Sequence, residues 1–158
     1  MRPKTAIISG RWSTYYKNHN PYSHINMEID KIEGTVSFLK KLGINKIILV
    51  GPSPEWYPSL PKVLFLSFKN DPMHRLPERM WSGLDESIQH LDKYMHEKAD
   101  RLDITYVSPF NALCNTEGCL TRLGDKPKDL VIGDGMHFTP SGSRFFINSV
   151  LANMSLDK

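Results

Sequence analysis

Short apolar runs alternate with amphipathic segments along most of this sequence. Lys4–Ser9, Lys46–Val50 and Ile104–Val107 are brief, apolar and contain β-branched residues, which predicts three strands. Between them, apolar side chains recur at helical spacing, first at Ile29, Ile32, Val36, Leu39 and Leu42, then at Ile88, Leu91, Tyr94 or Met95, and Ala99. Alternating strands and helices predict an α/β fold, in which a parallel sheet is joined by right-handed crossovers.

The residues that flank these segments fit the same prediction. Gly43 stands where a left-handed residue would end the first helix. The second helix, Asp85–Asp100, has acidic residues near its start and basic residues near its end, as the helix macrodipole favours. By contrast, Glu55–Gly83 contains four prolines, so we do not expect it to form one long regular element.

Length, composition and charge exclude some classes of protein. The chain has 158 residues, of which 40% are apolar and 23% charged, and this predicts a single globular domain over residues 1–158. The net charge is only +3 and the basic residues are scattered, so nucleic acid is not an expected partner. No apolar stretch reaches the roughly 18 residues of a membrane span. The N-terminal residues also lack the apolar region of a signal peptide.

A loop near the C-terminus carries the candidate chemistry. It follows the short apolar run Leu130–Ile132, which predicts a buried strand or the end of one. Gly133 and Gly135 flank Asp134 and provide the flexibility of a sharp loop. His137 stands three residues after Asp134, so a carboxylate and an imidazole share this loop.

A terminal helix is predicted directly after the loop. Thr139 is a suitable N-cap, and Pro140 suits the first helical position because it has no N–H that needs a partner there. The helix continues with an apolar stripe at Phe145, Phe146, Val150, Leu151 and Met154. We therefore expect the helix to hold the loop in place.

Asp134 and His137 form a candidate acid–base pair. A carboxylate bonded to one ring nitrogen fixes the tautomer of the imidazole and stabilises its charged form. The other nitrogen then remains free to take a proton from a hydroxyl nucleophile. The alternative is structural: Asp134 accepts hydrogen bonds from loop amides, and His137 is an ordinary loop residue.

Cys114 and Cys119 are the two cysteines of the chain, with four residues between them. They are compatible with a local disulfide, half of a metal site or two free thiols. A metal site needs further ligands, and neither a second cysteine pair nor a nearby histidine pair occurs. The sequence therefore predicts no metal site, and no motif indicates a cofactor.

Four blocks of sequence together resemble one family. They are Asp134-Gly-Met-His137-Phe-Thr-Pro-Ser-Gly142, Ile7-Ile-Ser-Gly-Arg-Trp12 followed by Tyr15, Val50-Gly-Pro-Ser-Pro-Glu55, and Val107-Ser-Pro with Leu113, Cys114 and Cys119. The first resembles the Asp-x-x-His block of SGNH (GDSL-type) esterases and acyltransferases. In this order, the blocks are similar to the SGNH domain fused behind the membrane part of acyltransferase-three proteins, which O-acetylate bacterial surface polysaccharides.

The resemblance implies a three-layer, flavodoxin-like parallel sheet and a location in the periplasm or elsewhere outside the cytoplasm. It also implies a disulfide between Cys114 and Cys119, which suits an oxidising compartment. Ligands of such sheets bind beyond the carboxyl ends of the strands. That edge is expected to gather Ser9–Arg11, Gly51–Pro52, Val107–Ser108 and the Asp134–His137 loop, with Ser9 and Arg11 as tentative substrate or oxyanion contacts.

The family's nucleophile is the serine of a Gly-Asp-Ser block, and this block has no counterpart here. Gly124-Asp125 and Gly133-Asp134 are the Gly-Asp pairs, and neither precedes a serine. The chain therefore resembles the C-terminal part of an SGNH domain, incomplete at its N-terminus. The implied substrates are an acyl ester and a sugar hydroxyl, and the implied partner is a membrane acyltransferase portion of a longer or neighbouring polypeptide.

Two further expectations concern the first strand and the residues after it. In the implied strand order, Thr5–Ile8 becomes an exposed edge, through which the chain could self-associate. Ser9 ends that strand and is an alternative nucleophile, which would make the chain a small free-standing esterase. A third alternative is a non-catalytic carbohydrate-binding or interaction module that uses the aromatic loop Trp12–Tyr22.

Overall fold

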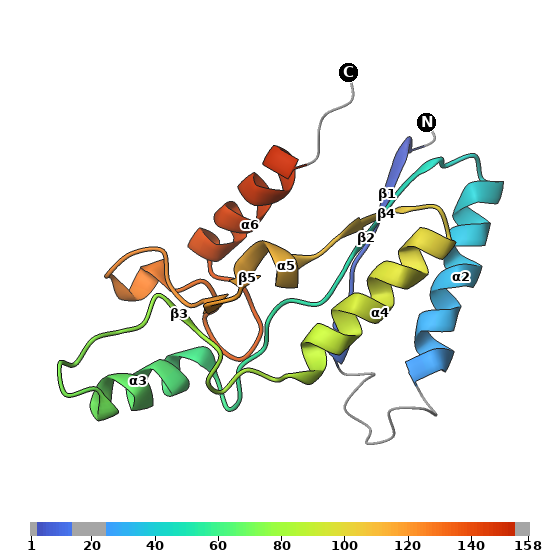
Figure 1. Ribbon diagram of the computed structural model, residues 1–158. Coiled ribbons are helices and arrows are strands. Elements are labelled where there is room, and N and C mark those ends of the chain that lie inside the picture. Colours follow the sequence, from blue (N-terminus) through green and yellow to red (C-terminus); the bar gives the residue numbers. More distant parts are fainter. Residues whose placement is uncertain (1–2, 14–24, 154–158) are drawn as a thin grey trace. The chain divides into compact units, whose positions relative to one another are not determined.

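The computed structural model describes residues 3–13 and 25–153, and these fall into two compact units (Figure 1). Unit 1 consists of Met1–Pro52 and Ser87–Ser108, and unit 2 of Ser53–Glu86 and Pro109–Lys158. Each unit is built from two separate stretches of the chain, and each is described by itself below. The expectation of a single domain over residues 1–158 stays a prediction.

Unit 1 contains a parallel sheet of three strands, β1 (Thr5–Ile8), β2 (Lys46–Val50) and β4 (Thr105–Val107), in the order β1-β2-β4. Ile7 pairs with Ile48 and Leu49 pairs with Tyr106. The three strands predicted from apolar runs are thus confirmed, and so is their parallel arrangement. Helices α2 (Ile25–Lys41) and α4 (Ser87–Arg101) provide the crossovers.

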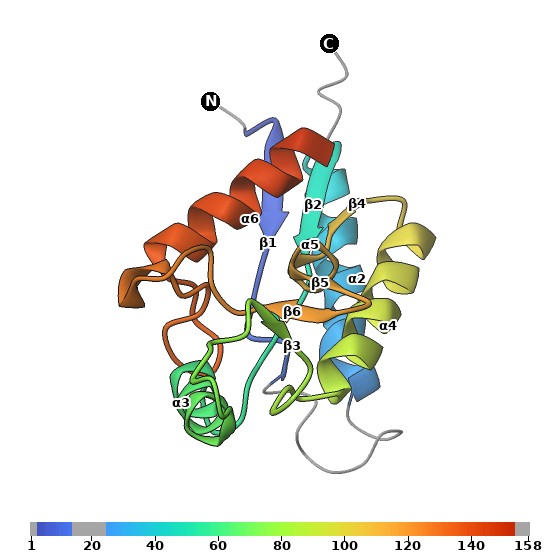
Figure 2. The same ribbon diagram turned by 60° about the vertical axis from the view of Figure 1, so that its left-hand side comes forward.

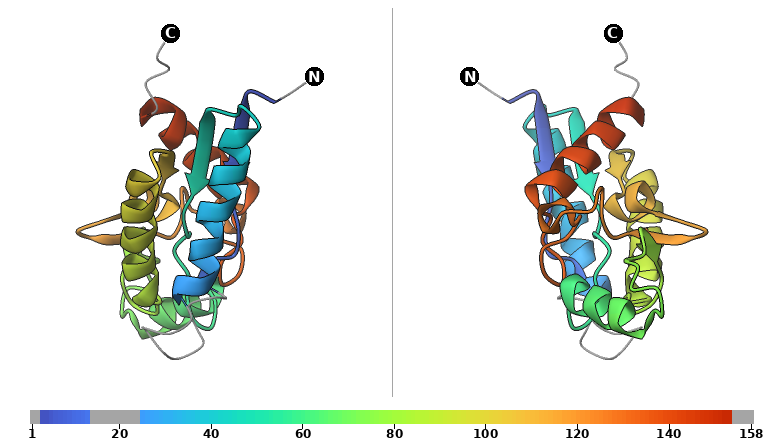
Figure 3. Two further views of the ribbon diagram at one scale, coloured as in Figure 1. Left: turned by 90° about the vertical axis from the view of Figure 1, so that its right-hand side faces the viewer. Right: turned by 90° about the vertical axis from the view of Figure 1, so that its left-hand side faces the viewer.

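Both helices of unit 1 cover the same face of this sheet (Figure 3). The fully buried part of this core comprises Ile32, Val36, Ile44, Ile47, Leu49, Leu91, Met95 and Ala99. Gly43 follows α2 with a φ of +81°, a conformation that residues with side chains rarely adopt, and so ends the helix as predicted. In α4, Met95 rather than the half-buried Tyr94 completes the buried stripe.

Strand β1 lies at an edge of the sheet, as the resemblance implied. Among the residues that the structure describes, β1 pairs with β2 alone. Ile7 points away from the helix-covered face and is 67% exposed. An exposed strand edge with an apolar side chain is a site at which another strand can pair, but self-association through β1 stays a prediction.

Unit 2 contains a small antiparallel sheet of very short strands, in the order β3-β6-β5 (Figure 2). Its elements are α3 (Leu60–Asn70), β3 (Arg79–Met80), α5 (Pro109–Leu113), β5 (Cys114–Asn115), β6 (Gly118–Leu120), the 3-10 turn η1 (Pro127–Asp129) and α6 (Pro140–Asn153). The terminal helix begins at Pro140, as predicted. Among the described residues, no helix is long and apolar enough to cross a bilayer.

Helix α3 was not predicted. The proline-rich segment Glu55–Gly83 does not form one long element, as expected, but it does include this helix of 11 residues. Pro61 lies in the first turn, where a missing N–H costs nothing, and the buried side chains Leu60, Val63 and Leu64 repeat at helical spacing.

The prediction of a strand at Leu130–Ile132 is wrong. Val131 and Ile132 are fully buried, which explains the apolar run. The run, however, makes only isolated antiparallel bridges, between Leu130 and Arg122 and between Ile132 and Phe138. The run is therefore apolar because it is enclosed in unit 2, and not because it belongs to a regular strand.

Cys114 and Cys119 form a disulfide, as the resemblance implied. The two residues face one another directly in the pairing of β5 with β6, so the bond closes this hairpin. Gly118 has a φ of +129°, and a Cβ there would lie 2.6 Å from the Met80 backbone. Glycine is therefore required where β6 passes β3.

Candidate active site

The start of α6 follows the Asp134–His137 loop directly and packs against the residues that precede it. The Thr139 hydroxyl accepts a hydrogen bond from the Gly142 N–H at 3.0 Å, which is the predicted N-cap interaction. The Thr139 N–H donates to the Val131 carbonyl at 3.0 Å. A Cβ at Gly142 would lie only 2.0 Å from that same carbonyl oxygen. Glycine therefore lets the first turn of α6 approach the residues that precede the loop.

Asp134 accepts three hydrogen bonds from its own loop. Its Oδ1 accepts the N–H groups of Met136 and His137, each at 2.8 Å. Its Oδ2 lies 2.7 Å from Nδ1 of His137. The two backbone N–H groups are the main reason that the pKa of this carboxyl falls from 3.8 to about 2, and the imidazole contact adds to them.

This geometry leaves one nitrogen of His137 free. A proton on Nδ1 is donated to the Asp134 carboxylate, so the neutral ring carries its lone pair on Nε2. The His137 side chain is 78% exposed. Within the described part of the chain, Nε2 makes no hydrogen bond or ion pair. The ring is therefore oriented on one side and able to accept a proton on the other.

The outer side of the loop is held by residues 53–60, the segment that follows the Gly-Pro-Ser-Pro block. Three consecutive carbonyls of the loop accept one hydrogen bond each from this segment. The bonds run from Leu60 N to Asp134 O at 2.8 Å, from Trp56 N to Gly135 O at 3.0 Å, and from Ser53 Oγ to Met136 O at 3.3 Å. We refer to residues 53–60 as the clamp, because they fix the loop backbone without touching the free nitrogen.

The clamp was not predicted, although its sequence block was recognised. Two of its three hydrogen bonds come from backbone N–H groups, which every residue except proline provides, so no side-chain pattern marks them. A Cβ at Gly135 would make only an ordinary van der Waals contact, 3.4 Å from the Trp56 carbonyl. The glycine beside Asp134 therefore does not mark the clamp either.

In unit 1, the carboxyl ends of the three parallel strands meet at one edge, as predicted. Ser9, Gly51 and Ser108 directly follow β1, β2 and β4. Ser9 and Arg11, the tentative substrate contacts, are both exposed. The structure brings Asp134 and His137 together in unit 2, whereas Ser9 and Arg11 belong to unit 1.

A buried carboxylate joins two elements at this edge of unit 1. Asp92 of α4 is 3% exposed and accepts hydrogen bonds from the Tyr106 hydroxyl at 2.8 Å and the Ser108 hydroxyl at 2.7 Å. Burial raises its pKa, and the two hydroxyls oppose that rise. A Cβ at Gly51 would lie 2.0 Å from the Tyr106 oxygen, so this position must be glycine.

Sequence reasoning missed this cluster, although a signal was present. Asp92 lies four residues after Ile88 and three before Met95, on the apolar stripe of α4. A charged residue on a buried stripe requires hydrogen-bond partners. The adjacent strand supplies them, and the cluster ties α4 to the end of β4.

Trp12, the first residue of the predicted aromatic loop, has a structural role. Its indole N–H donates to the Val50 carbonyl at 2.7 Å, and the ring packs against the core of unit 1. The remaining aromatic residues of the Trp12–Tyr22 loop lie outside the described residues, so the carbohydrate-binding alternative stays a prediction there.

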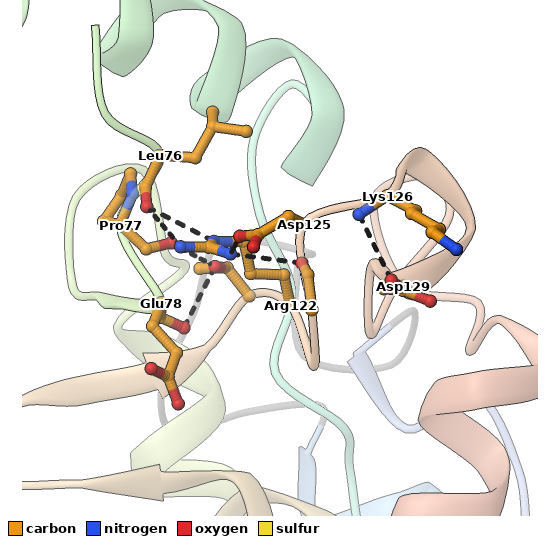
Figure 4. A network of polar contacts seen from close by, with 9 residues as sticks. Leu76, Pro77, Glu78, Arg122, Asp125, Lys126 and Asp129 are labelled. Carbon is orange, nitrogen blue, oxygen red and sulfur yellow. Dashed lines mark hydrogen bonds and ion pairs between the residues drawn. The ribbon is translucent and has the colours of Figure 1, made fainter.

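Arg122 is the most heavily bonded cation of unit 2 that Figure 4 shows, and it is also structural. Its guanidinium donates to the Leu76 carbonyl at 3.0 Å, to the Gly124 carbonyl at 3.1 Å and to Asp125 at 2.5 Å. The other Gly-Asp pair of the sequence is therefore part of a backbone anchor. Among the described residues, no group of three or more His, Cys, Asp or Glu side chains could hold a metal ion.

Comparisons with known proteins agree with this arrangement. The family model described as the SGNH domain fused to AT3 domains matches residues 1–151. The chain is also similar to a solved structure, the periplasmic domain of the lipopolysaccharide acetyltransferase of Salmonella ser. Paratyphi A, with 31% identity and a TM-score of 0.77. The match covers 95% of this chain and 56% of that one. No curated protein matches the chain.

Proposed function

Because the chain belongs to the family of SGNH domains fused to AT3 domains, we propose that it takes part in acyl transfer to or from sugar hydroxyls of a cell-surface polysaccharide. The observation that carries this proposal is the contact of Asp134 with Nδ1 of His137, which leaves Nε2 available as a base. The similar Salmonella domain comes from a lipopolysaccharide acetyltransferase, which supports acetyl as the acyl group.

In the proposed reaction, Nε2 of His137 takes the proton of a serine hydroxyl as its oxygen attacks the acyl carbonyl. Asp134 remains ionised and stabilises the imidazolium that forms, which its lowered pKa favours. The bond to the leaving alcohol breaks, and His137 returns the proton to that alcohol. A sugar hydroxyl then attacks the acyl-serine by the same route, and the serine regains its proton.

The nucleophilic serine is proposed to come from a segment outside these 158 residues. The sequence contains no Gly-Asp-Ser block. The chain corresponds to 56% of the similar Salmonella structure, so that protein contains further residues without a counterpart here. The exposed edge of β1 is a position at which additional strands could pair.

A membrane acyltransferase domain, on the same or a neighbouring polypeptide, is the proposed partner. It would deliver the acyl group, and the chain described here would act outside the cytoplasm. The disulfide between Cys114 and Cys119 supports this location, because such bonds persist in oxidising compartments.

The test is a reconstitution. The chain is produced alone and joined to an upstream segment that carries Gly-Asp-Ser, and hydrolysis of p-nitrophenyl acetate is measured for both. We expect the chain alone to show only background turnover and the joined protein to be active. In the joined protein, His137→Ala should lower kcat by about 10³-fold because the base is lost.

Ser9→Ala distinguishes the alternative of a free-standing esterase. Ser9 is exposed at the carboxyl end of β1, which is the edge where such a nucleophile would stand. If the chain alone turns over the ester and Ser9→Ala abolishes that turnover, the proposal that the nucleophile lies outside these 158 residues is wrong. Activity of the joined protein that is unchanged in His137→Ala would contradict the role of the base.

A further inference from the structure

Two exposed aromatic side chains stand on loops of unit 2 that are hydrogen-bonded to each other. Tyr57 is 82% exposed and Trp81 is 43% exposed. The Tyr57 N–H donates to the Gly83 carbonyl at 2.9 Å, and the Leu84 N–H donates to the Trp81 carbonyl at 3.1 Å. Single exposed aromatic residues are common on protein surfaces. A binding role for Tyr57 and Trp81 therefore has to be argued from the contacts that fix their positions.

The turn that carries Trp81 has a fixed position. Gly83 has a φ of +74°, and a Cβ there would lie 2.8 Å from the Val63 side chain of α3. The Trp81 indole N–H donates to the Thr116 carbonyl at 3.3 Å, in the turn of the disulfide-closed hairpin. The indole is therefore oriented although it is partly exposed. An aromatic ring that is already oriented loses little conformational entropy when it binds a ligand.

Tyr57 is tied to the candidate active site on both sides. The residue before it, Trp56, donates its N–H to the carbonyl of Gly135, and Leu60 donates its N–H to the carbonyl of Asp134. Both acceptors belong to the loop that ends at His137. The backbone on either side of Tyr57 is therefore bonded to this loop, and the exposed Tyr57 side chain stands on the clamp.

We propose that Tyr57, together with Trp81, binds the acceptor saccharide by stacking against the face of a pyranose ring. This inference rests on the proposed function and names the part of unit 2 that meets the sugar. The C–H groups on one face of a pyranose are attracted to the electron-rich face of an aromatic ring.

Phe65 provides a matched control on the same unit. It is 55% exposed, but it stands on α3, where the Lys62 ammonium lies 5.5 Å from its ring centroid. Among the described residues, no hydrogen bond joins the Phe65 backbone to the loop of His137. Removal of its ring tests whether any exposed aromatic residue binds sugar or whether the position on the clamp matters.

The first experiment measures binding and needs no catalysis. The 158-residue chain, labelled for NMR, is titrated with methyl pyranosides of glucose, galactose, mannose and rhamnose up to about 0.1 M, because one stacking contact gives only weak affinity. We expect the Trp81 indole N–H and Tyr57 ring signals to shift with at least one of these probes. Tyr57→Ala should weaken that binding about tenfold, whereas Tyr57→Phe and Phe65→Ala should change it little.

The outcome separates this inference from the proposed function. Two results would overturn the proposal that Tyr57 and Trp81 bind the saccharide. One is the absence of shifts at both rings with all four probes. The other is equal binding by Tyr57→Ala in a protein whose remaining spectrum is unchanged. In the joined protein, Tyr57→Ala should raise KM for the acceptor about tenfold with kcat nearly unchanged. If the two rings bind sugar but the joined protein transfers no acyl group, the saccharide site is supported and the proposed function is wrong.

Discussion

Asp134 and Asp92 are both aspartates with several hydrogen-bond donors, yet their surroundings shift their pKa values in opposite directions. Asp134, in unit 2, is exposed, and N–H groups of its own loop lower its pKa to about 2. Asp92, in unit 1, is buried, and the loss of water raises its pKa. The donors to Asp134 belong to its own loop and keep its charge beside an imidazole, whereas the donors to Asp92 come from the end of β4 and hold that strand to α4.

The two carboxylates also differ in whether their hydrogen-bond partners keep a group that is exposed to solvent. The partners of Asp92 are the hydroxyls of Tyr106 and Ser108, and burial together with Asp92 strongly raises the pKa of Tyr106. The carboxylate of this cluster is shielded from solvent, and both hydroxyls already donate to it. Asp134 is bonded to a histidine whose second nitrogen faces solvent, so proton exchange there is unobstructed. The first cluster therefore suits a structural role, and the second suits the role proposed for it in acyl transfer.

The largest effect is expected at the buried carboxylate. Asp92→Ala should lower the free energy of unfolding by about 3 kcal/mol, because two partly buried hydroxyls lose their buried acceptor. Asp134→Ala should change it far less, because the loop amides of that exposed site can bond to water. Urea unfolding measures both variants. Asp92→Asn, which keeps an acceptor oxygen, is the control and should be milder than Asp92→Ala. Equal losses for Asp92→Ala and Asp134→Ala would contradict the comparison.

Next in size is the effect of the exposed carboxylate on the reaction. In the joined protein, Asp134→Asn should lower kcat by about 10²-fold, less than His137→Ala, because the imidazole remains but its tautomer and charge are no longer held. Steady-state kinetics with p-nitrophenyl acetate measures this. Asp92→Asn should leave kcat nearly unchanged under conditions where the variant is folded. A larger kcat loss for Asp92→Asn than for Asp134→Asn would reverse the assignment.

The helices and strands that show a regular apolar pattern were predictable from the sequence. So was the Asp134–His137 pair, because its members are close together in the chain. Apolar runs identified all three parallel strands, and Thr139–Pro140 identified the start of α6. The Asp134–His137 contact was predictable because both residues occupy one short loop. By contrast, Leu130–Ile132 was taken for a strand because burial and strand pairing produce the same short apolar run.

What the sequence did not predict are the contacts between segments far apart in the chain. The clamp reaches the loop of His137 across about eighty residues, mainly through backbone N–H groups that leave no compositional trace. The partners of Asp92 lie on another element, although its place on an apolar stripe showed that partners were needed. Such contacts follow from tertiary structure rather than from local pattern.

A smaller effect is expected at the disulfide. In the loop-entropy model, reduction of a ring this short should cost about 2 kcal/mol of stability, since the bond removes little entropy from the unfolded chain. Urea unfolding with and without reductant measures the change. The double variant Cys114→Ser/Cys119→Ser is the control and should not respond to reductant. Mass spectrometry after alkylation without reductant should find no free thiols in folded chains from the periplasm, and two alkylated cysteines there would contradict the bond.

The smallest effect is the dependence of stability on pH, which has opposite signs at the two carboxylates. The pKa of Asp134 falls from 3.8 to about 2 on folding, so its contribution is fully present above pH 3.8 and is lost as the pH falls through about 2. Solvent screens this exposed group, which keeps the effect small. The pKa of Asp92 is raised, so its contribution is present below pH 3.8 and is lost as the pH rises through the raised value.

Urea midpoints measured from pH 2 to pH 7 separate these two contributions. Asp134→Asn should flatten the fall in stability between about pH 4 and pH 2, because the titrating group is gone. Asp92→Asn should instead remove a decline in stability that begins as the pH rises above 3.8, since an amide does not ionise. The same slope change in both variants would mean that the two carboxylates share one environment, and the contrast between a structural and a chemical aspartate would then be wrong.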